Sequence, residues 1–289
     1  MSDFILSAFA DEIDKDLDKQ MDVLDKNAIS YIEMRSVNGK ELVDFTLDEV
    51  REIKSELDTR GFKLSAIGSP IGKIMITDNF SKHLDLFKHT LEIAKIMEAK
   101  YIRMFSFVIP FKESPEKYRD EVMARWGKFI EVAKGTGITL LHENEKGMYG
   151  ETAERCLDLM KTLNCDFVKA VFDPANYVQS DVLVYPEAYN LLKDYIVYIH
   201  VKDALYSNHD EVPSGMGDGK LKEILLDLHN SNFKGFLSLE PHLGRYEEVS
   251  GDNKFHGCDN IDNIITGEYK FSIATNALKK ILLEIKASY

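Results

Sequence analysis

The sequence predicts a single α/β domain, residues 1–289, folded as one closed (β/α)₈ barrel. Eight short apolar runs alternate with amphipathic helical patterns, and strands that alternate with helices form a parallel sheet. Eight such units in a chain of this length, with no linker or low-complexity segment, fit a closed barrel. An open doubly wound sheet is the alternative, but that fold favours a glycine-rich first turn. The first turn here, "FADEIDKD", contains no glycine.

The predicted strands are short runs rich in apolar and β-branched residues. They cover residues 4–10, 31–35, 63–69, 101–108, 138–145, 168–173, 196–203 and 235–243.

The clearest predicted helices follow an apolar stripe with helical spacing. They cover residues 46–57, 81–97, 114–137, 219–232 and 272–287. Thr46 and Glu49 have the spacing of a capping box, which marks the start of a helix. Between the sixth and seventh strands, a helix is expected to begin near Pro186.

Composition restricts the partners and the compartment. The chain carries 49 acidic and 36 basic residues, and its charge of −13 argues against nucleic acid or an anionic membrane as a partner. Its three cysteines show no CxxC spacing, which suits a reducing cytosol. The N-terminus lacks a basic, apolar signal pattern, and no apolar run is long enough to span a bilayer. We therefore expect a cytoplasmic protein.

Acidic and histidine residues stand at the ends of four successive predicted strands. In (β/α)₈ barrels the carboxyl ends of the strands form the active site. There we expect Glu143, Asp173, His200 and Glu240 to converge. A single glutamate or histidine at a strand end is usually salt-bridged or structural, but several buried charges require a partner. Oxygen and nitrogen donors in this mixture suit one divalent ion: Mn²⁺, Mg²⁺, Co²⁺ or Zn²⁺.

The motifs "LLHENE", "FDPANY", "IHVKD" and "SLEPH", in this order, resemble the xylose isomerase-like TIM barrel superfamily. That superfamily includes sugar-phosphate isomerases and epimerases, inosose dehydratases and a DNA-repair endonuclease. The resemblance implies metal ligation by Glu143, Asp173, His200 and Glu240, with Mn²⁺ the favoured ion. It also implies that Glu143 and Glu240 move protons on opposite faces of an open-chain sugar.

Other polar residues near the strand ends are candidates for substrate binding: Lys202, His242, Glu33 and Arg35. For Glu33 the alternative is a buried ion pair with an arginine such as Arg103. His242 alternatively caps the loop after the last strand. Asp203 is a candidate for orienting a metal ligand.

Three further residues are weaker candidates. They are Asn176, His142 and Lys73. Lys73 lies in "SPIGK" after the third strand, and the simpler interpretation is a solvated loop lysine.

The predicted activity is that of a metal-dependent isomerase or epimerase acting on a sugar or sugar phosphate through an enediolate. An inosose or polyol dehydratase on the same metal site and a non-catalytic sugar-binding barrel are the alternatives. The nuclease branch would need more histidines and a basic groove. The sequence does not fix which sugar is bound, whether it is phosphorylated, or which ion is used.

A glycine-rich segment and a long insertion lie on either side of the last predicted strand. The motif "SGMGDGK" has three residues between Gly215 and Gly219 and no Ser or Thr after Lys220, so it is not a phosphate-binding P-loop. It is expected to form a flexible loop over the metal that ends at the start of the next helix. The insertion 244–269 is interpreted as a lid or a subunit contact, which leaves a homo-oligomer open.

Overall fold

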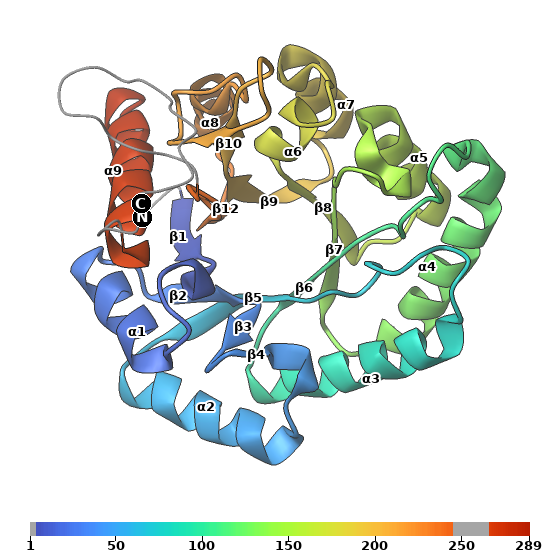
Figure 1. The fold of residues 1–289 in the computed structure, drawn as a ribbon, viewed down its shortest axis with the longest axis horizontal. Coiled ribbons are helices and arrows are strands. Elements are labelled where there is room, and N and C mark those ends of the chain that lie inside the picture. Colours follow the sequence, from blue (N-terminus) through green and yellow to red (C-terminus); the bar gives the residue numbers. More distant parts are fainter. Residues whose placement is uncertain (1–3, 245–265) are drawn as a thin grey trace, which may run out of the picture.

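Eight parallel strands close into a barrel in a computed structural model that describes residues 4–244 and 266–289 (Figure 1). The order around the barrel is β1-β12-β9-β8-β7-β6-β5-β2. The strands are β1 (Phe4–Ala8), β2 (Tyr31–Met34), β5 (Lys63–Gly68), β6 (Tyr101–Met104), β7 (Thr139–Glu143), β8 (Val168–Phe172), β9 (Ile196–Val201) and β12 (Gly235–Leu239). The predicted (β/α)₈ architecture is confirmed.

Helices surround this ring of strands on the outside (Figure 1). They are α1 (Leu17–Lys26), α2 (Leu47–Thr59), α3 (Phe80–Ile96), α4 (Arg119–Ala133), α5 (Ala153–Leu163), α6 (Pro174–Val178), α7 (Tyr189–Leu192), α8 (Leu221–Asn230) and α9 (Gly267–Glu284). Each barrel strand is followed by at least one of them before the next barrel strand begins. Of the helices described, none is long and apolar enough to cross a membrane.

Local sequence signals account for several helix boundaries. Thr46 and Glu49 form the predicted capping box at the start of α2, with both reciprocal hydrogen bonds present. The helix expected to start at Ser114 begins as a 3₁₀ turn, Pro115–Tyr118, before α4. The helix expected near Pro186 is a π-helical turn, Val184–Ala188, that leads into α7.

The barrel closes where its first strand meets its last. β1 pairs with β12 from Phe4 opposite Gly235 to Ala8 opposite Leu239. The Phe4 N–H also donates to the Ser288 carbonyl oxygen at 3.1 Å, beyond the end of α9. Both ends of the described chain are therefore fixed to the same side of the barrel.

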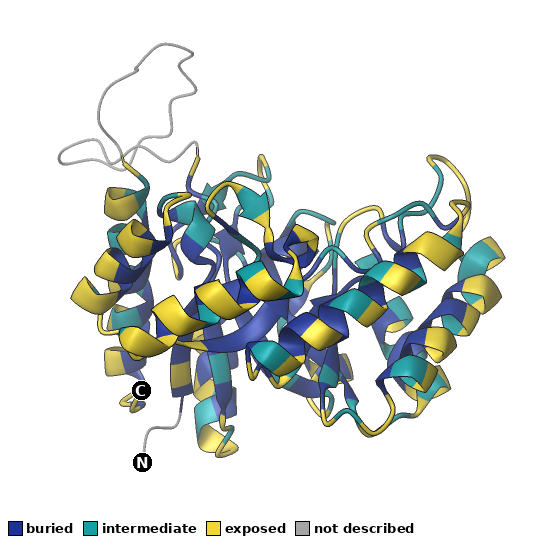
Figure 2. Cartoon of the chain, turned by 90° about the horizontal axis from the view of Figure 1, so that it is seen from below, coloured by how far each residue is buried: buried dark blue, intermediate teal, exposed yellow. Residues whose placement is uncertain are grey.

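The apolar core has two zones. The larger zone lies between the barrel wall and the inward faces of the helices, whose outer faces are exposed (Figure 2). A smaller cluster fills the inside of the barrel: Ala66, Leu141, Val171 and Tyr198. The barrel is thus a packed core rather than a pore.

Two small hairpins extend from the strand ends. They are β3 (Ser36–Val37) with β4 (Lys40–Glu41), and β10 (Asp203–Ala204) with β11 (Glu211–Val212). The "SGMGDGK" loop after β11 wraps around the Asp203 carboxylate, which accepts N–H groups from Gly215, Gly217 and Gly219 at 2.8–3.0 Å. Asp203 therefore holds a loop. Residues 245–265 of the predicted lid or subunit contact lie outside the described residues.

Candidate metal centre and active-site pocket

Four side chains from neighbouring strand ends converge at the carboxyl end of the barrel. They are Glu143 in β7, Asp173 directly after β8, His200 in β9 and Glu240 directly after β12. One donor atom of each lies within 4.8 Å of the others, and all four residues are buried. Because these strands are consecutive in the barrel wall, inward-facing residues at one height meet. We call the four residues the carboxylate–histidine cluster.

His200 lies at the centre of this cluster. Its Nδ1 is 3.0 Å from Glu143 Oε1, 3.5 Å from Glu240 Oε2 and 3.7 Å from Asp173 Oδ2. Its Nε2 points the other way, 3.2 Å from Glu33 Oε2. Burial alone would lower the pKa of His200, but the charges of Glu143 and Glu33 raise it well above its ordinary value. The same negative field would attract a cation.

The "FDPANY" motif sets the orientation of Asp173. Asp173 is the N-cap of α6, and its Oδ1 accepts the Asn176 N–H at 2.8 Å. Pro174 occupies the first helical position, where its missing N–H costs nothing. The other oxygen, Oδ2, is buried and has no hydrogen-bond partner among the described residues. A buried carboxylate oxygen without a partner is costly, so a bound cation would satisfy it.

Asn176 connects the cluster to a buried lysine. Its Nδ2 donates to Glu143 Oε1 at 3.2 Å, and its Oδ1 accepts from Lys202 Nζ at 2.9 Å. Lys202 Nζ also lies 3.8 Å from Asp173 Oδ2. Asn176 is one of the three weaker candidates from the sequence, yet its side chain contacts both Glu143 and Lys202.

Glu143 is paired with an arginine inside the barrel. Arg103 Nε lies 3.2 Å from Glu143 Oε2 and 3.9 Å from Glu33 Oε1. Burial alone would raise the pKa of Glu143, but the charges of His200 and Arg103 hold it below its ordinary value. Glu143 is therefore ionised at neutral pH.

Glu240 has its own cationic partners. Arg35 Nη1 donates to Glu240 Oε1 at 2.9 Å, while Arg35 Nε donates to Asp11 at 2.8 Å. Although burial opposes ionisation, Lys202 and the contact with His242 hold the pKa of Glu240 well below its ordinary value. Both glutamates of the cluster are thus carboxylates.

A pocket of about 300 Å³ opens over one side of the cluster. Glu143 and Glu240 line this pocket, whereas Asp173 and His200 are fully buried and do not. Its other charged or histidine lining residues are Arg35, Glu41, Lys73, Arg103, Glu145, Lys202 and His242. The pocket is therefore polar, and only two members of the cluster are accessible from it.

His242 lies at the edge of this pocket between two carboxylates. Its Nε2 is 3.2 Å from Glu240 Oε1, and its Nδ1 is 3.4 Å from Glu12 Oε1. Burial raises the pKa of Glu12 from 4.5 to about 7. Glu12 and Asp11 were missed in the sequence, although both follow the first predicted strand. The strand-end argument applied to "FADE" would have found them.

Not all of the residues predicted to bind substrate line the pocket. Lys202, His242 and Arg35 line the pocket, but Glu33 is fully buried behind His200 and does not. Substrate contact by these residues stays a prediction. His142 points to the outer side of β7, where its ring lies 5.8 Å from that of Trp126. It takes no part in the site.

The cluster fits a divalent cation. It offers oxygen donors from three carboxylates and one imidazole nitrogen, with Nδ1 facing all three carboxylates. This donor set suits Mn²⁺, Mg²⁺, Co²⁺ or Zn²⁺. The strongest single indication is that the buried Oδ2 of Asp173 accepts no hydrogen bond from the described residues.

The barrel fold of this chain is shared with known proteins. Residues 22–253 match the family described as xylose isomerase-like TIM barrel. The chain belongs to this family. All four members of the carboxylate–histidine cluster lie within the residues matched.

One curated relative in the xylose isomerase-like family is a probable L-ribulose-5-phosphate 3-epimerase, UlaE, from Mycoplasma pneumoniae. It is 23% identical over 193 residues, which are 65% of this chain. The chain spans 63% of the length of that relative.

Solved structures share the fold over nearly the whole chain. A D-tagatose 3-epimerase-like protein has a TM-score of 0.72 at 14% identity, covering 99% of this chain and 100% of the other. The IOLI protein, solved with a bound zinc atom, has a TM-score of 0.70 at 18% identity, covering 99% of each chain.

Proposed function

We propose that this protein is a metal-dependent isomerase or epimerase of a sugar or sugar phosphate that removes a proton next to a carbonyl. One observation carries the proposal: of the four cluster residues, only Glu143 and Glu240 line the pocket. These two come from β7 and β12, with β8 and β9 between them in the barrel wall. They can therefore approach a bound sugar from two sides. The curated epimerase relative supports the same chemistry.

Glu143, Asp173, His200 and Glu240 would hold one divalent cation, with Mn²⁺ favoured over Mg²⁺, Co²⁺ and Zn²⁺. When bound, the cation would polarise the substrate carbonyl and lower the cost of the negative charge that develops as an enediolate. Asn176 and Arg103 keep Glu143 in place, and Arg35 keeps Glu240 in place.

Glu143 and Glu240 would carry the proton. Each is ionised at neutral pH, because neighbouring positive charges hold its pKa below the ordinary value. One carboxylate takes the proton from the carbon next to the carbonyl. A proton returned by the opposite carboxylate inverts that carbon. A proton returned instead to the former carbonyl carbon moves the carbonyl, provided that the hydroxyl proton passes to the former carbonyl oxygen.

His242 would supply the proton that Glu240 returns to the substrate. Burial opposes its charged form, but the hydrogen bond to Glu240 raises the pKa of His242 above its ordinary value. Its Nε2 is 3.2 Å from Glu240 Oε1, so a proton can pass between them. Glu12, on the other side of the ring, can replace that proton.

Four basic side chains line the pocket together with four carboxylates: Arg35, Lys73, Arg103 and Lys202 with Glu41, Glu143, Glu145 and Glu240. Lys73 lines the pocket, its side chain is 51% exposed, and its Nζ lies 3.4 Å from Glu145 Oε2. Lys202 and Arg103 line the same pocket. Lys73 has the most exposed side chain of the four cations, and it would meet a phosphate group if the substrate carries one.

The test is solvent exchange. The Mn²⁺-loaded protein would be incubated in D₂O with a panel of ketoses, ketose 5-phosphates and an inosose, and the products followed by NMR. Deuterium at the carbon next to the carbonyl, with an epimer or aldose as product, supports the proposal. A product lacking one water would identify a dehydratase instead. No exchange with any member of the panel would contradict the proposal.

A further inference from the structure

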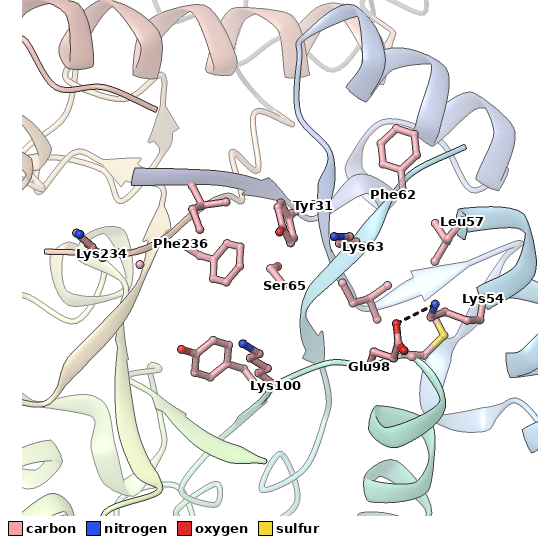
Figure 3. Close-up of a pocket in the computed structure, with 15 residues that line it drawn as sticks. Tyr31, Lys54, Leu57, Phe62, Lys63, Ser65, Glu98, Lys100, Lys234 and Phe236 are labelled. Atoms are coloured by element: carbon pink, nitrogen blue, oxygen red, sulfur yellow. Dashed lines mark ion pairs between the residues drawn. The ribbon is translucent and has the colours of Figure 1, made fainter. Parts of the chain in front are cut away.

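A second cavity, of about 440 Å³, opens at the opposite end of the barrel (Figure 3). It lies at the amino ends of β1, β2, β5, β6 and β12, and no residue of the cluster or of the active-site pocket lines it. It is larger than the pocket over the candidate metal centre. Nothing in the proposed chemistry uses it.

The charged groups around this cavity are mostly positive. Four lysines and one glutamate line it, and Glu98 pairs with Lys54 at 3.2 Å. Lys63, Lys100 and Lys234 are exposed and form no ion pair with any residue in the described parts of the chain. The whole chain carries a charge of −13. The unpaired lysines therefore make the surroundings of this cavity positive although the whole chain is negative, and they favour the binding of an anion.

An aromatic wall lies beside these lysines. The Phe236 ring meets the Tyr31 ring edge-on, with centroids 5.1 Å apart, and the Tyr101 ring at 6.3 Å. Figure 3 shows Tyr31 and Phe236 together next to Ser65. An aromatic or apolar body would gain by packing against such rings.

Two hydroxyl groups at this wall are free to donate. Neither the Tyr31 nor the Tyr101 hydroxyl has a hydrogen-bond partner among residues 4–244 and 266–289. Burial raises the pKa of Tyr101, so its phenol keeps the proton that it would donate. A carboxylate or phosphate oxygen is the acceptor that suits such donors.

The floor of the cavity is closed. Ser65 lines it, and Ser65 Oγ lies 2.6 Å from Ser7 Oγ and 2.8 Å from the Tyr198 hydroxyl. Tyr198 belongs to the packed cluster inside the barrel. The cavity is thus a separate site rather than the far end of a channel from the metal centre.

We propose that this cavity binds a small amphipathic anion, namely a carboxylate or phosphate monoester with an aromatic or apolar body. Lys63 and Lys100 meet the anionic group, while Lys234 adds positive charge on the far side of Phe236 (Figure 3). The rings of Tyr31, Tyr101 and Phe236 contact the body. This site is independent of the proposed sugar chemistry.

Binding can be measured by ¹⁹F NMR titration with 4-fluorophenyl phosphate and 4-fluorobenzoate, and with neutral 4-fluorobenzyl alcohol as the comparison. The test variant combines Lys63→Gln, Lys100→Gln and Lys234→Gln. The control combines Lys134→Gln, Lys161→Gln and Lys193→Gln, three exposed lysines without an ion pair in the described structure. Both variants change the net charge equally, so a general charge effect cancels.

We expect saturable binding of at least one anion. The test variant should weaken it at least tenfold, and the control less than twofold. Lys73→Gln, which alters the pocket at the metal centre, should leave the affinity unchanged. Tyr31→Phe with Tyr101→Phe keeps both rings, and it should weaken binding about threefold, the loss of a modest hydrogen bond.

Four results would overturn the proposal. They are no saturable binding of either anion, an unchanged affinity in the test variant, an equal loss in the control, and equal binding of the neutral alcohol. Circular dichroism melting curves check that the variants fold. If the lysine variant melts early, the double Tyr→Phe variant decides.

Discussion

Glu33 lies directly behind His200, with its Oε2 3.2 Å from Nε2 of the imidazole. Both residues are fully buried. A carboxylate in this position accepts the Nε2 proton, so the lone pair of Nδ1 would be left for a cation held together with the three carboxylates in front of it. Glu33 is therefore a positioning residue for the candidate metal centre.

Replacing Glu33 should weaken metal binding without removing a donor. Glu33→Ala frees the imidazole to rotate, and we expect the Mn²⁺ affinity to fall about 10- to 100-fold. Glu33→Gln still offers an acceptor and should lose less. Isothermal titration calorimetry measures both, with Glu52→Gln on the exposed face of α2 as the control. Wild-type affinity in Glu33→Ala would show that packing alone orients His200.

Glu143→Gln and Glu240→Gln should each abolish proton exchange. An amide can neither take nor give the substrate proton, so the exchange rate should fall at least about 100-fold. Deuterium incorporation followed by NMR gives the rate. Exchange at the wild-type rate in both variants would exclude the two carboxylates as the acid and base.

Substitution of Asp173 can distinguish an effect on metal binding from an effect on folding. Asp173→Asn keeps a side-chain oxygen to cap α6 but loses the negative charge of Oδ2. The metal-free variant should melt close to the metal-free wild type. The wild type should gain about 2.7 kcal/mol when Mn²⁺ is at 100 times its Kd. The Asn variant should gain almost nothing under the same conditions.

Differential scanning calorimetry with EDTA and with Mn²⁺ tests this. Asp173→Ala is the comparison, because it also removes the cap and should cost about 1 kcal/mol even without metal. An equal Mn²⁺-induced rise in Tm for the wild type and the Asn variant would contradict the assignment of Asp173 as a ligand.

His83 should make stability fall in mild acid. The Gly72 N–H donates to His83 Nε2 at 2.7 Å, and burial lowers the pKa of His83 from 6.5 to about 4. The unfolded chain takes up a proton at about pH 6.5, whereas the folded chain does not until about pH 4. The contribution of neutral His83 is thus complete above pH 6.5 and lost as the pH falls toward 4.

The measurement is urea unfolding of the wild type and His83→Gln at pH 7 and pH 4. Glutamine offers an acceptor that does not titrate. The wild type should lose about 2 kcal/mol more than the variant between these pH values. An equal change in the free energy of unfolding with pH in the wild type and the variant would show that His83 has the same pKa in the folded and unfolded chain.

The apolar runs predict strands correctly where their backbone pairs with neighbouring barrel strands. The prediction is less accurate where the backbone of an apolar run pairs with a loop. The run 101–108 predicts one long strand, but β6 ends at Met104. Beyond it, the Phe105 N–H donates to Ile71 O and the Phe107 N–H to Gly72 O. These partners lie in the loop after β5. An apolar pattern carries no information on which backbone it will meet.

The cluster residues could be predicted because strand side chains alternate with period two. The role of Glu33 could not. The pairing of β2 with β5 shifts by one residue between Ile32 and Glu33, so the register depends on an irregularity that the sequence does not mark. Glu33 and His200 are also separated by 167 positions.

Phe4 and Ser288 are hydrogen-bonded, so the two ends of the described chain lie close together. The barrel could therefore form from a chain in which the strand–helix units follow one another in a different order. A short linker joining these ends would allow the backbone to be opened elsewhere. The exposed turn 134–137 between α4 and β7, at the end of the barrel away from the carboxylate–histidine cluster, is one such place. Such a circular permutant would begin at β7 and keep every strand pair. The four cluster residues would then all come from its first half.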